Sequence, residues 1–194
     1  MAADGIRLVV GLGNPGSQYE ATRHNVGFWF VDGLAARNAA QFRVESKFHG
    51  MLARIHLAGA DLRLLKPTTF MNRSGQSIVA ASQYFAIQPQ NILVVHDELD
   101  LPVGTLRLKQ GGGHGGHNGL RDTMQALGGR DFWRLRIGID HPGDRNQVVS
   151  YVLSRASKDD ETTILDGLSD AEAVMDDLVR GTFQKAMHRL HSDR

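Results

Sequence analysis

The chain has 194 residues, a length that favours a single domain, residues 1–194, with one hydrophobic core. It contains no cysteine, which excludes a thiol nucleophile, a zinc–thiolate site and any disulfide, and which fits a reducing compartment such as the cytoplasm. With 22 lysines and arginines against 21 aspartates and glutamates, the net charge of +1 argues neither for nor against a nucleic-acid partner. No apolar run reaches membrane-spanning length and no secretory signal pattern opens the chain, so we expect no membrane association.

The predicted elements alternate between strands and helices. The apolar run Ile92-Leu93-Val94-Val95 is typical of a central strand, Gly59 marks a hairpin turn, and Asn118 and Gly128 are suited to cap the two ends of a helix. Strands are expected at 7–10, 51–57, 61–65, 92–95, 105–109 and 133–139, and helices at 26–40, 74–85, 118–127, 158–179 and 182–191. This order predicts an α/β fold, a three-layer α/β/α sandwich around a twisted mixed sheet.

His24 follows the first predicted strand and a glycine-rich turn that also contains Asn14. Open α/β sheets place their ligand sites just beyond the carboxyl ends of the strands, so both side chains are expected at such a site. An imidazole in that position can serve as a general base. A lone histidine is more often structural, and this stretch alone leaves both interpretations open.

The glycines of that turn also fit a different function. The spacing of Gly11, Gly13 and Gly16 satisfies the fingerprint of a dinucleotide-binding turn. That fingerprint requires a helix opening at the third glycine and a second strand that ends in an acidic residue about 20 residues later. A polar stretch follows Gly16 here, and a helix is predicted at 26–40 where the strand should be. A dinucleotide-dependent oxidoreductase therefore remains an alternative that depends on the glycine spacing alone.

Asp97 comes at the carboxyl end of the strand predicted at 92–95. The chain has no Gly-x-Ser-x-Gly motif, and Ser74 lacks the strand-to-helix context of an activated serine. Water activated by a histidine is the simplest chemistry that is left. Asp97 is the best candidate to orient His24 in a base-and-orienter pair, and a turn-capping role in the acidic cluster 97–100 is the alternative.

A glycine-rich stretch, 111–119, leads into the helix predicted at 118–127. Its backbone N–H groups and the helix dipole could bind an anion or an oxyanion, whereas a flexible surface loop is the plain alternative. Metal binding by His114 and His117 is a third possibility. We disfavour it, because the chain offers no partner ligand at standard spacing and no His-Glu-x-x-His motif.

Basic residues alternate on two predicted strands near this stretch: Arg107 and Lys109 on one, Arg134 and Arg136 on the other, with Arg145 beyond them. A period of two directs each pair to one side of a sheet. If the two faces meet, they form a phosphate-binding patch without requiring a basic protein. Solvated surface charges are the alternative interpretation.

Six segments taken together resemble the bacterial peptidyl-tRNA hydrolase family. They are 10–16 (VGLGNPG), 22–25 (TRHN), 66–75 (KPTTFMNRSG), 96–100 (HDELD), 111–119 (GGGHGGHNG) and 134–139 (RLRIGI), and they run in family order up to about Leu153. The resemblance implies a monomeric α/β/α hydrolase, without metal or cofactor, that cleaves the ester joining a stranded peptide to tRNA and so recycles the tRNA. The helices at 158–191 match the family in pattern only and are expected to pack near the cleft.

The resemblance also implies roles for matching positions. His24 becomes the general base that activates water, Asp97 its orienting partner, and Asn14 an amide that holds the reacting ester. The residues expected to bind the peptide and the ester are Asn72, Asn118, Met71, Tyr19, Phe70 and His117. Those expected to bind tRNA through its phosphates and acceptor end are Lys109, Arg136, Arg107 and Arg145. Phosphate contacts position a nucleic acid without specifying its sequence, which would let one enzyme serve many tRNAs.

A non-catalytic RNA-binding module is the second alternative. It would keep Lys109 and Arg136 and make His24 incidental. The intact set of His24, Asp97 and the asparagines argues against it.

Overall fold

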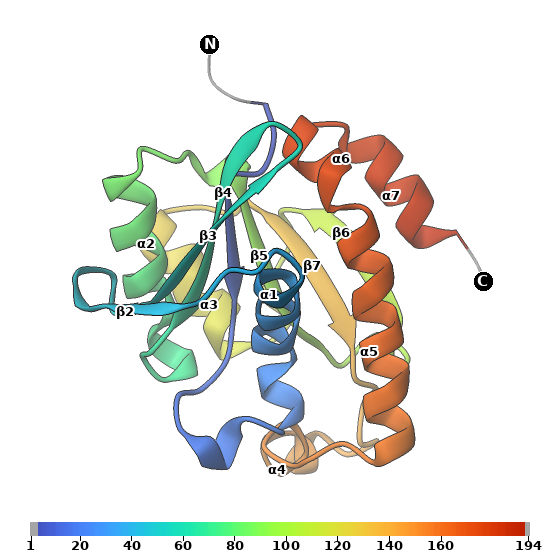
Figure 1. Cartoon of the computed structure of the whole chain (residues 1–194). Helices are drawn as coiled ribbons and strands as arrows, with labels where there is room; N and C mark the ends of the chain where they lie inside the picture. The colour runs from blue at the N-terminus through green and yellow to red at the C-terminus, as the bar shows by residue number, and fades with distance from the viewer. Residues whose placement is uncertain (1–3, 193–194) are drawn as a thin grey trace.

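The computed structural model describes residues 4–192, and its centre is one mixed sheet with the strand order β2-β3-β4-β1-β5-β7-β6 (Figure 1). The strands are β1 (Leu8–Gly11), β2 (Arg43–Glu45), β3 (Gly50–Leu57), β4 (Ala60–Pro67), β5 (Ile92–Glu98), β6 (Leu106–Gln110) and β7 (Trp133–Gly138). The pairs β4–β1, β1–β5 and β5–β7 are parallel, and β2–β3, β3–β4 and β6–β7 are antiparallel. The predicted α/β fold with a mixed sheet is confirmed.

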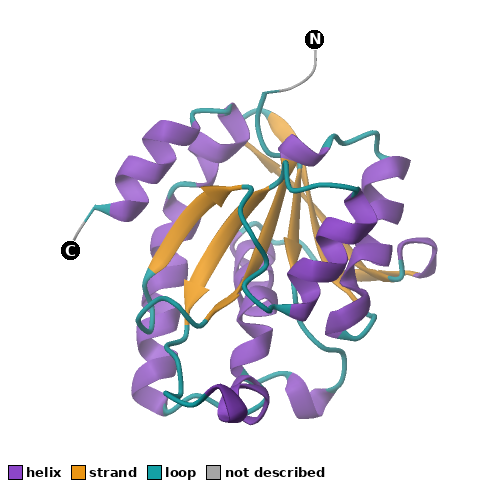
Figure 2. Ribbon diagram, turned by 180° about the vertical axis from the view of Figure 1, so that it is seen from behind, coloured by secondary structure: helices purple, strands orange, loops and turns teal. Residues whose placement is uncertain are grey.

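Helices cover both faces of this sheet. On one face α1 (Val26–Arg37) packs against β1, β4 and β5, and α5 (Lys158–Ala173), α6 (Met175–Arg180) and α7 (Phe183–His191) complete the layer. On the other face lie α2 (Ser74–Tyr84) and α3 (Asn118–Leu127), and a short α4 (Val148–Val152) follows β7 in the chain. Figure 2 shows that α2 and α3 cover only part of their face, so that β7 and β6 carry no helix there.

The apolar sequence of the central strand β5 follows from its burial on both faces of the sheet. Residues Ile92 to Asp97 are all buried, because the sheet is covered on both sides at this point. Leu93 and Val95 belong to the core cluster with α1, whereas Ile92 and Val94 belong to the cluster with α2 and α3. The strand continues through His96 and Asp97. It therefore places two polar side chains inside the fold.

The structure changes several predicted boundaries. The helix predicted at 158–179 is two helices with a break at Val174, and the predicted strands and helices omitted the short edge strand β2 and helix α4. β2 has only three residues, too few to give a reliable periodic pattern, and its Val44 is exposed. The cap of α3 is His117 rather than Asn118: Nδ1 of His117 accepts hydrogen bonds from the N–H groups of Gly119 (3.1 Å) and Leu120 (3.3 Å). Within residues 4–192 no helix is both long and apolar enough to cross a bilayer.

Gly27 determines how closely α1 approaches the sheet. A Cβ atom at this position would lie 2.4 Å from the carbonyl oxygen of Val95 and 2.7 Å from the backbone nitrogen of Leu12. Close-packed interiors leave no room for such contacts. Any side chain at Gly27 would push the start of α1 away from the sheet, together with the residues that precede it.

We expect Gly27→Ala to lower the free energy of unfolding by about 1–3 kcal/mol, the usual cost of overpacking a core. Gly33→Ala in the same helix is the matched control, because its Cβ would meet only the end of the flexible Glu172 side chain. That control should change stability by less than about 1 kcal/mol, with the helix propensity of alanine in its favour. Urea unfolding followed by circular dichroism measures both, and equal losses would contradict this account of Gly27.

Candidate active site

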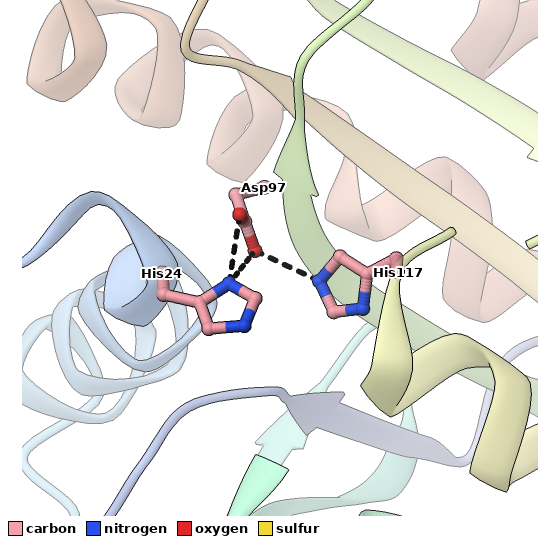
Figure 3. A group of neighbouring side chains, drawn as sticks. All are labelled: His24, Asp97 and His117. Carbon is pink, nitrogen blue, oxygen red and sulfur yellow. Dashed lines mark hydrogen bonds and ion pairs between the residues drawn. The ribbon is translucent and has the colours of Figure 1, made fainter. Parts of the chain in front are cut away.

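Two histidines share one buried carboxylate at the carboxyl end of β5 (Figure 3). Nδ1 of His24 lies 3.0 Å from Oδ1 and 2.9 Å from Oδ2 of Asp97, and Nε2 of His117 lies 2.8 Å from Oδ1. His24 comes from the 3₁₀ turn η2 (Arg23–Asn25) before α1, and His117 from the cap of α3. Only the fold brings together these residues, which lie far apart in the sequence.

The hydrogen bonds fix the proton positions on both rings. A carboxylate only accepts hydrogen bonds, so Nδ1 of His24 and Nε2 of His117 must each carry a proton when they bind Asp97. Nδ1 of His117 also accepts from the backbone at the start of α3, which requires the same tautomer. In its neutral form, His24 therefore presents an unprotonated Nε2 on the side of its ring away from Asp97, which is the form that a general base needs.

Electrostatics favours the same arrangement. Burial by itself would raise the pKa of the Asp97 carboxyl, but the two histidines hold that pKa well below its usual range, so Asp97 stays ionised. Burial works against a charge on His24, yet the charge and hydrogen bond of Asp97 outweigh it and raise the pKa of His24. Asp97 thus orients the imidazole and would stabilise a positive charge on it.

The turn η2, which carries His24, is held by contacts with α4 and with the residues that follow it. The guanidinium of Arg23 lies 4.0 Å from the ring centroid of Tyr151, and it donates hydrogen bonds to the carbonyl oxygen of Tyr151 (3.1 Å) and to Oγ of Ser154 (2.5 Å). Thr22 forms an isolated β-bridge with Arg155. These contacts fix the turn η2, and with it the position of His24.

Asn14 is fixed by a second asparagine and by the backbone of Met71. The side chain of Asn25 accepts from the N–H of Asn14 (2.9 Å) and donates to its carbonyl oxygen (3.0 Å). Oδ1 of Asn14 accepts from the N–H of Met71 at 2.8 Å. Nδ2 of Asn14 has no hydrogen-bond partner among residues 4–192 and stays available as a donor beside the two histidines.

A cleft of about 530 Å³ opens beside these groups. The predicted residues that line it are His24, Asp97, Asn14, Phe70, Met71, Asn72, His117, Asn118 and Arg145. Tyr19 is not among the described lining residues and lies in the 3₁₀ turn η1 (Ser17–Tyr19). Past β7, the lining comes from 141–153, including Val148, Val149 and Val152 around α4, and none of it from 158–191. The helices α5 and α7 pack on β6 instead.

The other predicted tRNA-binding residues lie on the part of the sheet that α2 and α3 leave uncovered. Arg107 pairs with Arg136, and Lys109 with Arg134, directly across β6 and β7, so all four leave the sheet on one side. Nε of Arg136 donates to Oε1 of Glu98 at 2.8 Å. Lys109 is exposed and has no ion pair within the described part of the chain. Arg145 lines the cleft instead, in the turn η6 (Arg145–Gln147).

The two histidines and Asp97 also form the one group, within residues 4–192, whose ligand atoms lie close enough to hold a metal, all within 4.8 Å of one another. A metal bound to Nε2 of His117 would force the proton onto Nδ1. The N–H groups of Gly119 and Leu120 already point at that atom, so three donors would face one another. The donor set therefore suits hydrogen bonding better than metal coordination.

Sequence reasoning gave no role to Asn25 or His96, and it placed Arg134 in a phosphate-binding patch, although all three shape the site. Asn25 fixes Asn14, and His96 and Arg134 connect β5 and β7 to the glycine-rich loop through buried hydrogen bonds. The position of Asn25 directly after His24 was the available hint. The apolar residues of α4 were missed as well, because the helix has only five residues and gives no helical periodicity.

A histidine and an ionised carboxylate beside a cleft at the strand ends of an α/β sheet fit the base-and-orienter pair of a hydrolase. The family model described as peptidyl-tRNA hydrolase matches residues 8–194. A peptidyl-tRNA hydrolase of Methylobacillus flagellatus is 53% identical over 189 residues, which cover 97% of this chain and 98% of the relative. One of Coxiella burnetii is 52% identical, with 97% and 98% covered.

The fold agrees with these sequences. A crystal structure of peptidyl-tRNA hydrolase from Acinetobacter baumannii matches with a TM-score of 0.96 at 46% identity, covering 100% of this chain and 98% of that chain. The chain therefore belongs to the peptidyl-tRNA hydrolase family, and it is an enzyme that hydrolyses the ester of peptidyl-tRNA. A dinucleotide-binding turn is not formed, because α1 begins at Val26 rather than at Gly16.

We expect the pKa of His24 to lie above 6.5, the value of an unperturbed histidine. A general base must be neutral, so kcat/KM should rise with pH through this raised pKa and be lost below it. Asp97→Asn removes the charge that raises the pKa of His24 and leaves the burial that lowers it. The acid limb of the pH–rate profile should then move to lower pH while the plateau rate falls. An acid limb that stays in place would assign Asp97 a structural role only.

Proposed function

We propose that His24 is the general base of this hydrolase, acting on the ester between the 3′ end of tRNA and a peptide or an N-blocked amino acid. The hydrogen bonds of His24 and His117 to Asp97 are the observation that carries the proposal. The reaction would recycle tRNA from stalled or prematurely released peptidyl-tRNA, in the cytoplasm, by a monomer. No step requires a metal or a cofactor.

The reaction is a hydrolysis in which every proton has a place. Nε2 of His24 takes a proton from water as the oxygen attacks the ester carbonyl, and Asp97 stabilises the imidazolium that forms. The ester oxygen of the tRNA ribose leaves and takes the proton back from His24. The peptide departs as a carboxylic acid, which ionises in water. Nδ2 of Asn14 donates a hydrogen bond to the carbonyl oxygen of the ester, on which negative charge develops as the water attacks.

The cleft supplies both kinds of contact that a peptide needs. Phe70 and Met71 offer an apolar surface, and Asn72 and Asn118 offer donors and acceptors for its backbone. An asparagine side chain provides both functions and does not titrate, so peptide binding would not depend on pH. With His117 in place as the cap of α3, the side chain of Asn118 is not needed for capping and is free for the substrate.

The basic face of β6 and β7 supports a separate tRNA contact. Lys109 and Arg136 would bind a phosphate group at the tRNA end, and Arg107, across from Arg136, would extend the contact. Arg145 would bind tRNA at the rim of the cleft, close to the ester. Because phosphates are common to all tRNAs, this mode of binding selects the end of the molecule rather than its sequence.

We expect His24→Ala to lower kcat by about 10²- to 10⁴-fold, the usual contribution of a general base, and to leave substrate affinity nearly unchanged. The base acts on water and anchors neither half of the substrate. Turnover of an N-blocked aminoacyl-tRNA measures kcat, and filter binding measures affinity. Near-normal turnover by the variant would rule out His24 as the base.

Lys109 and Arg136 should affect the binding of tRNA and hardly affect bond cleavage. Their contacts with a remote phosphate are equal in the ground and transition states, so Lys109→Ala/Arg136→Ala should raise KM and leave kcat nearly unchanged. The salt dependence of binding should also become weaker, because fewer counterions are released.

A blocked aminoacyl ester without the tRNA 5′ end is the control substrate for this double variant. It has no phosphate for either side chain to bind, so the wild-type protein and the variant should cleave it equally. A lower kcat on full tRNA, or a loss of activity on the small ester, would show that these residues are catalytic or structural.

A further inference from the structure

Arg134 differs from the other cations on the same face of the sheet. Arg134 is only 3% exposed, whereas Lys109, directly across from it on β6, is exposed. A buried guanidinium is stable only if its donors are satisfied. The role of Arg134 can therefore be inferred from the protein groups to which its guanidinium donates hydrogen bonds.

The donors of Arg134 are directed at the glycine-rich loop and at β5. Nη1 donates to the carbonyl oxygens of Gly111 (3.1 Å) and Gly113 (2.9 Å), and Nε donates to Nε2 of His96 at 3.2 Å. Nη2 lies 4.0 Å from Oε1 of Glu98. One side chain on β7 thus binds two carbonyl groups of the loop and the strand that carries Asp97.

His96 transmits this contact to the backbone of Asp97. Its Nδ1–H donates to the carbonyl oxygen of Asp97 at 2.8 Å, which leaves Nε2 as the acceptor for Arg134. Burial, together with the neighbouring His117 and the cation of Arg134, keeps the pKa of His96 well below its usual range. His96 therefore stays neutral and keeps this tautomer across the working range of pH.

The glycines of the loop make it costly to order, so contacts from the rest of the fold are needed to hold it. Gly111, Gly112, Gly115 and Gly116 all have positive φ angles, and glycine loses more conformational freedom on ordering than any other residue. At Gly112 a Cβ would lie 2.8 Å from Nζ of Lys109 and 3.2 Å from Nη1 of Arg134, so a side chain would displace both cations. The loop ends in His117, which must reach Asp97.

We propose that Arg134 is a positioning residue, whose guanidinium holds the glycine-rich loop against β5 so that His117 stays in hydrogen-bond contact with Asp97. It does not bind tRNA. The inference depends on the proposed role of Asp97 in catalysis, which His117 supports through its hydrogen bond to the carboxylate. The two arginines of β7 then have different roles. Arg136 would bind a phosphate of the tRNA, whereas Arg134, two residues earlier, holds the loop that carries His117.

The test compares Arg134→Ala with Arg130→Ala, a variant of an exposed arginine whose side chain has no hydrogen bond or ion pair within residues 4–192. Misplacing a catalytic group by about 1 Å costs on the order of 10²-fold, so kcat of Arg134→Ala should fall by about this factor. The fall should be the same on blocked aminoacyl-tRNA and on the small blocked ester, with KM nearly unchanged. Arg130→Ala should match the wild-type protein.

Rescue separates positioning from a general loss of fold. Guanidinium ion added at millimolar concentration should restore part of kcat in Arg134→Ala, and methylammonium should restore less, because only the planar cation reproduces the fork of donors. Guanidinium should not raise the rate of Arg134→Ala/His117→Ala. That double variant should also be no slower than His117→Ala, since both changes remove one contact.

Three results would overturn the proposal. A raised KM with unchanged kcat on tRNA would make Arg134 a phosphate ligand. Losses that multiply in the double variant would show that Arg134 acts independently of His117. A lower melting temperature with no recovery by guanidinium would show a purely structural role. None of these depends on the base itself, because a failure of the proposed function would appear separately as normal turnover in His24→Ala.

Discussion

The ionised carboxylate of Asp97 is the constraint on which the rest of the site depends. Burying a charge is costly unless it is paired and hydrogen-bonded, and the fold satisfies this one with two imidazole N–H donors from opposite sides. That requirement brings together the turn before α1, the end of β5 and the cap of α3. The same hydrogen bonds select the tautomer of His24, so the stability of the buried charge and the proton position on the imidazole have a single cause.

The side chains that line the cleft and the cations of β6 and β7 lie on different parts of the sheet. The cleft beside His24 is lined by asparagines and apolar side chains, which suits a neutral ester and a peptide. The cations lie on β6 and β7, where the second helical layer does not extend. Glu98 offsets part of the charge of Arg136, and Arg134 is turned inward to the loop. Lys109, Arg107 and Arg136 thus lie outside the lining of the cleft, whereas Arg145 is part of it.

Much of the fold and of the site could be predicted from the sequence, because the signals were local. The apolar run at 92–95 predicted the central strand, Gly59 the hairpin between β3 and β4, and Gly128 the end of α3, where its φ of 73° is a conformation that favours glycine. His24 and Asp97 were predicted to lie near each other, because side chains that follow buried strands gather at one edge of the sheet.

The sequence by itself determined the α/β class, most of the elements, and the residues that the family pattern marks for the site. Only the tertiary structure decided their partners. His117, expected to bind substrate, lines the cleft and also caps α3 and binds Asp97, whereas Asn118, expected as the cap, is free to face the cleft. Arg134 and Arg136 are equivalent in a pattern of period two, yet one is buried and the other is partly open to solvent. The physical reason is that a side chain's role depends on which distant groups can satisfy its hydrogen bonds, and spacing along a chain does not contain that information.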